Sequence, residues 1–149
     1  MAAENLAWVV AQMPHQPPMR LIDEVVSVDG GHIQCRCRIH EDHILLDDGR
    51  VSALAAIELF AQAAAALMVY RATKAGVTPT GGYLLGTRKV DLEVDYFLIG
   101  DELTIDVNEL WGNGPLAQFE CSVAQGDTVL ATGSINVAAA GGPPPEAPN

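Results

Sequence analysis

One stretch of the chain is apolar at almost every position, while much of the rest alternates. Between residues 51 and 70 only Ser52, Glu58 and Gln62 interrupt an apolar run. Alanine, the strongest helix former, dominates this run, which predicts a helix reaching about Lys74. A helix that is apolar on nearly every side must be enclosed by other elements. We therefore expect this helix at the centre of the fold, with Ser52 as its N-cap.

Most of the remaining chain alternates between apolar and polar residues with a period of two, which is typical of strands with one buried face. Two such runs precede the helix and four follow it: residues 21–28, 33–39, 83–94, 103–108, 119–123 and 129–137. Glycine-containing segments at 29–31, 111–115 and 126–127 predict turns, and Gly133 predicts a bulge in the last run.

This order of elements predicts an α+β fold in which a bent antiparallel sheet wraps around one long central helix. Strands with one apolar face need a cover for that face, and the apolar helix is the candidate. We expect a short helix before Pro14, a linker at 76–82, one domain over residues 1–138 and a disordered Gly- and Pro-rich tail over 139–149. The sheet keeps an open edge, so we expect edge-to-edge pairing into a dimer.

Composition and charge narrow the function classes. With 49% apolar and 18% charged residues, the chain is typical of a globular protein. Its formal net charge of −11 argues against nucleic acid binding, because phosphate contacts need clustered Lys and Arg. No basic and then apolar signal sequence is visible, so we expect a cytoplasmic protein whose cysteines, Cys35, Cys37 and Cys121, are reduced. We do not expect a membrane span, because the apolar run is rich in alanine and contains Glu58 and Gln62.

Glu58 is an acidic residue within the otherwise apolar predicted helix, and its presence there needs an explanation. A carboxylate there is costly unless it is paired, protonated or facing a cavity. Gln62 follows four residues later and lies on the same helix face. The sequence leaves three interpretations open: a satisfied polar pair with Gln62, a side chain that faces solvent, or a functional carboxyl.

The remaining candidates for chemistry are weaker. His40 and His32 are expected at the surface, and His15 is expected to be structural, with a cap over a site mouth as the alternative. Cys35 and Cys37 are two residues apart, which is not a zinc-binding spacing, so we expect no metal site.

Two motifs give the chain a family resemblance. Residues 14–25 carry a Pro-His pair, further prolines, apolar residues and Asp-Glu-Val, and residues 58–62 read Glu-Leu-Phe-Ala-Gln. Both resemble motifs of the 3-hydroxyacyl-(acyl carrier protein) dehydratases of fatty acid synthesis, which have the hotdog fold. Residues 47–51, Asp-Asp-Gly-Arg-Val, resemble the dehydratase-like proteins of aryl polyene clusters. The resemblance covers about residues 10–138.

The resemblance implies a function and a set of site residues. It implies dehydration of 3-hydroxyacyl thioesters, carried by acyl carrier protein or coenzyme A, with no cofactor. His43 is implied as the base and Glu58 as the acid, acting from opposite subunits of a dimer. Backbone N–H groups near Ala53 would hold the thioester oxygen, and Gln62 would orient Glu58 or a water. The assembly implied is a homodimer, a higher homo-oligomer or a pair with a related hotdog subunit.

The chain departs from the family pattern around its histidine, which keeps two alternatives open. The loop reads His43-Ile-Leu-Leu where the family usually has His-Phe-Pro-Gly, and Ala53 stands where it has glycine. One alternative is a hotdog thioesterase that uses a carboxylate and the same helix start to hydrolyse an acyl thioester. The other is a catalytically weak pseudo-dehydratase that stabilises an active paralogue as its dimer partner.

Overall fold

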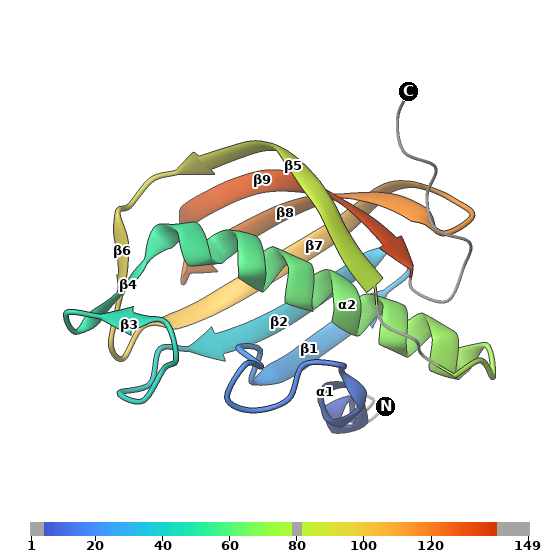
Figure 1. The fold of residues 1–149 in the computed structure, drawn as a ribbon, viewed down its shortest axis with the longest axis horizontal. Coiled ribbons are helices and arrows are strands. Elements are labelled where there is room, and N and C mark those ends of the chain that lie inside the picture. The colour runs from blue at the N-terminus through green and yellow to red at the C-terminus, as the bar shows by residue number, and fades with distance from the viewer. Residues whose placement is uncertain (1–4, 79–81, 140–149) are drawn as a thin grey trace.

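A computed structural model describes residues 5–78 and 82–139, in which an antiparallel sheet bends around one long helix (Figure 1). The helices are α1 (Ala7–Gln12), the 3-10 helix η1 (Ala53–Ala55) and α2 (Ala56–Lys74). The strands are β1 (Glu24–Asp29), β2 (His32–Arg38), β3 (Leu46–Asp47), β4 (Arg50–Ser52), β5 (Gly82–Leu92), β6 (Tyr96–Leu98), β7 (Glu102–Asn113), β8 (Leu116–Gln125) and β9 (Thr128–Ala139). The predicted fold class, including the short first helix, is confirmed.

The main sheet contains the six strands that the alternation predicts. Its order is β1-β2-β7-β8-β9-β5, every neighbouring pair is antiparallel, and β1 and β5 form its edges. Gly30 and Gly126 adopt left-handed backbone conformations, each with φ of 59°, at two of the predicted turns. The predicted turn at 111–115 is too long, because β7 continues to Asn113 and only residues 114–115 form the turn.

Gly133 serves a purpose in β9 other than the predicted bulge. It pairs in regular register with Val90 on one side and Cys121 on the other, so the bulge prediction is wrong. A Cβ atom at this position would lie 2.7 Å from the Lys89 carbonyl oxygen and 3.2 Å from the Phe60 ring. Glycine is needed here because β5 and α2 approach the strand too closely for a side chain.

A second sheet, of order β3-β4-β6, has no counterpart in the sequence prediction. Its strands are two or three residues long, which is too short for an alternating pattern to be recognised. β4 leads into η1, where the Ser52 hydroxyl accepts a hydrogen bond from the Leu54 N–H at 3.3 Å. Ser52 is therefore a cap, but it caps the 3-10 turn, and α2 itself begins at Ala56.

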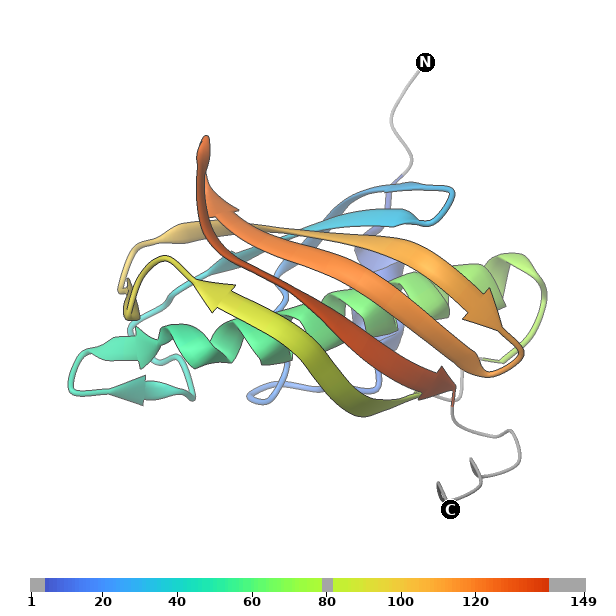
Figure 2. The same cartoon turned by 90° about the horizontal axis from the view of Figure 1, so that it is seen from above.

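The helix α2 forms the centre of the core, but the sheet covers only one side of it. Figures 1 and 2 show the sheet curving around that side, with β5 as one free edge. Leu54 of η1 and the other side of α2 form a stripe of exposed or half-buried side chains spaced three or four residues apart: Leu54, Glu58, Ala61, Ala65 and Met68. The expectation that the helix is enclosed on every side is therefore wrong for a single chain.

The apolar helix also satisfies a simple test for membrane spans. Ala53–Lys74 is long and apolar enough to cross a membrane by length and composition, and 56% of its apolar window is buried inside the domain. That degree of burial within the fold is the environment of a core helix. Of the predicted tail at 139–149, only Ala139 is described and it ends β9; the rest of the tail and residues 79–81 of the predicted linker lie outside the described residues.

Candidate active site

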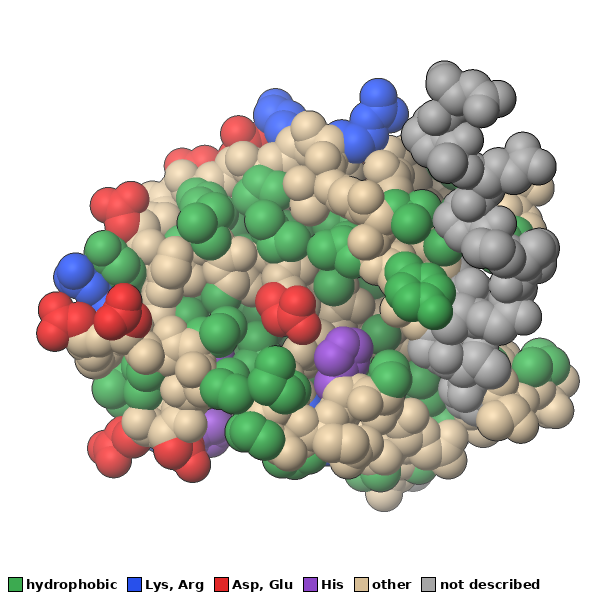
Figure 3. Space-filling view, viewed as in Figure 1, with side chains coloured by type: hydrophobic (Ala, Val, Ile, Leu, Met, Phe, Trp, Pro, Cys, Tyr) green, Lys and Arg blue, Asp and Glu red, His purple; other side chains and the backbone are tan. Residues whose placement is uncertain are grey.

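A pocket of about 340 Å³, here called the α2 slot, opens beside the uncovered stripe of α2. Its lining residues are Pro14, His15, Glu58, Ala61, Ala65, Met68, Gly82, Tyr83, Leu84 and Val137. The walls therefore come from α2, β5, β9 and the proline-rich segment, residues 14–20. Figure 3 shows hydrophobic side chains across the middle of this face of the molecule, while most acidic side chains lie toward its left edge. An apolar slot with a few polar groups is the usual form of a small-molecule site.

Gln62 is a buried polar residue whose hydrogen bonds connect the elements around this slot. Its side chain is 0% exposed, and its Nε2 donates to Glu58 Oε1 at 2.8 Å and to the Met19 carbonyl oxygen at 2.9 Å. Its Oε1 accepts a hydrogen bond from the Leu21 N–H at 2.7 Å. The amide therefore uses both of its N–H groups and fixes the helix, the proline-rich segment and the carboxyl relative to one another.

Glu58 lies in the slot and is exposed in the single chain, which agrees with the interpretation that it faces solvent and not with a carboxyl enclosed by apolar side chains. One protomer alone does not supply that enclosure, because Glu58 belongs to the side of α2 that the sheet leaves uncovered. The bond from Gln62 occupies Oε1. Oε2 is then the oxygen best placed to exchange a proton with a ligand.

His43 is half-buried in the loop between β2 and β3 and is not among the described lining residues of the α2 slot. The α2 slot of a single chain therefore contains Glu58 but not His43. His43 Nδ1 accepts a hydrogen bond from the Leu45 N–H at 3.1 Å. Burial lowers the pKa of His43 from 6.5; nearby Asp23 and Asp42 oppose that shift, and His40 adds to it.

The family resemblance implies hydrogen-bond donors near Ala53, but the Ala53 N–H itself is not one of them. This N–H donates to the Asp95 carbonyl oxygen at 2.9 Å, and the Ala53 side chain is fully buried. The next N–H, that of Leu54, is bonded to the Ser52 hydroxyl. These two N–H groups are already satisfied, so a thioester oxygen needs another donor.

His15 lines the α2 slot, although the sequence ranks it below His43. Its Nδ1 is enclosed and has no hydrogen-bond partner. The other two histidines have acidic neighbours: His32 Nε2 lies 2.7 Å from Asp106, and His40 Nε2 lies 3.6 Å from Asp23. The sequence signal for His15 is the Pro-His pair itself, which carries no information about the pocket it reaches.

The three cysteines are free and buried, as predicted for reduced thiols. Burial raises the pKa of each thiol to about 12, so none of them is suited to act as a nucleophile. Within residues 5–78 and 82–139, no group of three or more His, Cys, Asp or Glu side chains gathers as metal ligands would.

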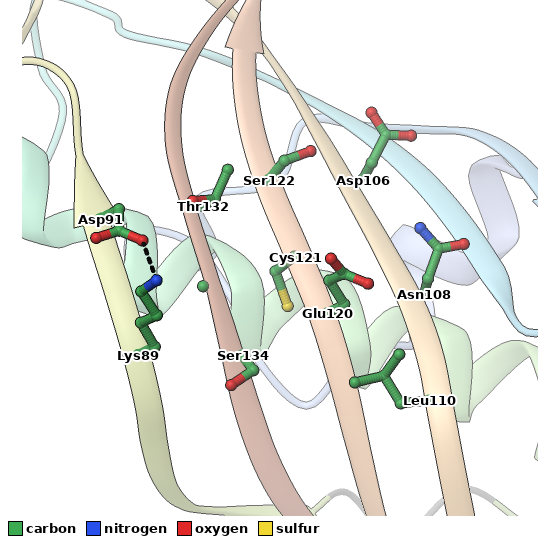
Figure 4. A pocket seen from close by; sticks show the side chains of 11 residues that line it. Lys89, Asp91, Asp106, Asn108, Leu110, Glu120, Cys121, Ser122, Thr132 and Ser134 are labelled. Atoms are coloured by element: carbon green, nitrogen blue, oxygen red, sulfur yellow. Dashed lines mark ion pairs between the residues drawn. The ribbon is translucent and has the colours of Figure 1, made fainter.

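A larger hollow of about 600 Å³ lies on the outer face of the six-stranded sheet, away from α2 (Figure 4). Polar side chains of β5, β7, β8 and β9 line most of it, and Lys89 forms an ion pair with Asp91 at 3.5 Å. This hollow shares no lining residue with the α2 slot. The candidate catalytic residues are absent from it.

Comparison with known proteins gives one family match. The sequence matches the family described as ApeP-like, ApeP dehydratase, over residues 8–144. Among solved structures, a chain of the dehydratase heterocomplex ApeI:P from Xenorhabdus doucetiae is similar, with 30% identity and a TM-score of 0.83. The similarity covers 87% of this chain and 90% of that one. No curated protein matches the sequence.

Two more distant structures share the fold alone. Cj0977, a sigma28-regulated virulence protein from Campylobacter jejuni, has 17% identity and a TM-score of 0.64, covering 95% of this chain and 94% of its own. A hypothetical thioesterase with coenzyme A from Streptococcus pneumoniae has 12% identity and a TM-score of 0.60, covering 79% and 85%.

Proposed function

Because the chain belongs to the ApeP-like dehydratase family, we propose that it removes water from 3-hydroxyacyl thioesters and yields trans-2-enoyl thioesters. The observation that carries this proposal is the Glu58 carboxyl, held by Gln62 in a slot lined mainly by apolar residues. An apolar slot suits an acyl chain, and a held carboxyl suits proton transfer to a leaving oxygen.

The reaction needs an acid for the 3-hydroxyl and a base for the proton on C2. Glu58 is the proposed acid, since Gln62 satisfies Oε1 and leaves Oε2 to carry the proton. As C2 loses its proton, the C2–C3 double bond forms and the C3–O bond breaks with its electrons on oxygen. The oxygen takes the Glu58 proton and leaves as water. A neighbouring protomer over the stripe would exclude bulk water from this step.

His43 of a neighbouring protomer is the proposed base, as the family resemblance implies. Burial lowers its pKa, so the ring is neutral at neutral pH. The Leu45 N–H bonds to Nδ1, which puts the proton of the neutral ring on Nε2. His43 must therefore give up the Leu45 contact before Nδ1 can accept the C2 proton. Such rearrangement on substrate binding is common for catalytic groups in ligand-free structures.

Two features of the single chain support an assembly of at least two protomers. The edge strand β5 is 11 residues long, and an edge strand can pair with another chain. In addition, Leu54 of η1 is 62% exposed and Tyr83 of β5 is 61% exposed, which leaves apolar surface to be covered. The partner is a second copy, in a homodimer or higher oligomer, or a related hotdog subunit as in the ApeI:P heterocomplex.

The proposed substrate is a thioester of acyl carrier protein or coenzyme A, used in fatty acid or aryl polyene-type synthesis in the cytoplasm. The family match supports the reaction class, and the buried reduced thiols agree with a reducing compartment. The proposed steps use side chains of the protein and require no cofactor.

Purified protein should convert a 3-hydroxyacyl thioester to the enoyl thioester, detected by the ultraviolet absorbance of the conjugated product. Glu58→Gln and His43→Gln should each lower turnover by about a hundredfold or more while the unfolding temperature changes little. Wild-type rates in both variants would rule out these assignments. Release of free thiol without enoyl product would identify a thioesterase instead.

A partner-dependent form of the same function has its own support in the structure. Glu58 is exposed in one chain, and His43 lies outside its slot, so neither residue forms a complete site alone. A pseudo-dehydratase role would appear as co-purification with a hotdog paralogue, no turnover alone, and full turnover of the complex when His43 is replaced.

A further inference from the structure

The role of His15 is the main feature of the α2 slot that the proposed mechanism leaves unexplained. A single chain places His15 and Glu58 in the same slot, so their proximity does not depend on a partner. His32 differs, because Asp106 lies 2.7 Å from its Nε2 on the other face of the sheet. Enclosed His15 Nδ1 has no partner among the described residues. A ring without a protein partner in a ligand-sized pocket is suited to bind a ligand.

The enclosure of Nδ1 indicates which ring nitrogen of His15 carries the proton. A neutral imidazole has one N–H and one acceptor nitrogen. An enclosed N–H without an acceptor is costly and rare in proteins, and an unpaired acceptor is better tolerated. The proton therefore belongs on Nε2, which is not enclosed in this way, and the ring lines the slot.

Hydrogen bonds fix the backbone that follows His15. Gln62 bonds to the Met19 carbonyl oxygen and to the Leu21 N–H, and the Met19 N–H donates to the Gln16 carbonyl oxygen at 2.8 Å. The same Gln62 side chain also holds Glu58. One buried amide thus positions both the proline-rich segment, which carries His15, and α2, which carries Glu58. Two groups that bind the same ligand atom need such fixed relative positions.

We propose that His15 donates a hydrogen bond from Nε2–H to the 3-hydroxyl oxygen of the substrate, and so holds the leaving group against Glu58. The proposal rests on the proposed dehydration. Glu58, which lines the same slot as His15, reacts at the same oxygen in the proposed mechanism. During the reaction His15 keeps its proton. Its hydrogen bond steadies the negative charge that develops on the leaving oxygen before the Glu58 proton arrives.

The test compares two ligands that differ only in the 3-hydroxyl group. The ligands are a 3-hydroxyacyl and a saturated acyl pantetheine thioester of equal chain length. They are titrated by calorimetry into full-length Glu58→Gln protein, in the assembly in which it purifies, so that no turnover occurs. Adding His15→Ala should weaken binding of the hydroxylated ligand by about fivefold to tenfold and leave the saturated ligand unchanged. His15→Asn, which keeps a donor, should recover part of the preference, and His32→Gln should leave it intact.

Equal weakening of both ligands by His15→Ala would show a structural role, and unchanged binding of both would show no role; either result overturns the proposal. These results are distinct from failure of the proposed function. If the wild-type assembly neither forms enoyl product nor prefers the hydroxylated ligand, the dehydratase assignment fails, whatever the His15 variants do. If wild-type turnover is normal and His15→Ala keeps the preference, only the His15 assignment fails.

Discussion

Replacing Gln62 by leucine tests the hydrogen-bond network that organises the α2 slot. Leucine has nearly the same volume, so the substitution removes hydrogen bonds without opening a cavity. The losses are the bonds to Glu58 Oε1 and the Met19 carbonyl oxygen, and the bond from the buried Leu21 N–H. At roughly 0.5–1.5 kcal/mol per bond, with the Leu21 N–H left unpaired, the free energy of unfolding should fall by about 2–4 kcal/mol. The unfolding temperature should fall by roughly 5–15 °C.

Urea unfolding at one fixed protein concentration measures this loss, because an oligomer's apparent stability depends on concentration. Gln118→Leu is the matched control: Gln118 accepts one exposed hydrogen bond, from Trp111 Nε1 at 3.0 Å. The control should stay within about 0.5 kcal/mol of wild type. A Gln62→Leu protein as stable as the control would refute the reasoning, since it would mean that the buried amide contributes nothing to the fold.

Three further predictions follow from single features of the fold. Gly133→Ala should destabilise the protein by about 1–3 kcal/mol in urea unfolding, because the new Cβ would lie 2.7 Å from the Lys89 carbonyl oxygen. Gly86→Ala is the control: a Cβ there has no atom within 4 Å, so the free energy of unfolding should change little. Because burial lowers the pKa of His43 in the folded state, its contribution to stability is present above pH 6.5 and declines as pH falls below it, where the unfolded ring takes up a proton. His43→Gln should therefore reduce the loss of stability on acidification, and an identical pH profile would contradict this. The three buried thiols, with pKa about 12, should react with a disulfide reagent at pH 8 at least a hundredfold more slowly in native protein than in urea, and rapid native labelling would show that they are accessible.

The long elements of the fold were predictable because their side-chain patterns persist over many residues. β2 and β7 alternate with one buried face, and α2 is a run of alanine with few interruptions. The strands of the second sheet are too short for such a pattern, so the sequence indicates only a loop there. A glycine within a strand pattern, such as Gly133, suggests a bulge when only the sequence is known. Its actual role depends on the close approach of Lys89 and Phe60, which the packing of β5 and α2 determines.

The candidate site was predictable only where its contacts are local. Gln62 and Glu58 are four residues apart on one helix, and their hydrogen bond follows from that spacing. The Gln62 bond to Leu21 joins residues 41 apart, and no sequence pattern predicts it. The exposure of Glu58 depends on which side of α2 the sheet covers. His15 reaches the slot through the same long-range packing, so the sequence alone indicates only a weak candidate for chemistry at this position.

Complementation between two inactive variants tests most directly whether Glu58 and His43 act from different subunits. Glu58→Gln and His43→Gln chains are co-expressed with different affinity tags and assayed for dehydration of a 3-hydroxyacyl thioester. Each variant alone should be inactive, and random mixing should restore about a quarter of wild-type activity, since half the dimers are mixed and each has one intact site. A mixture as inactive as its components, or full activity in either variant alone, would contradict a site shared across the interface.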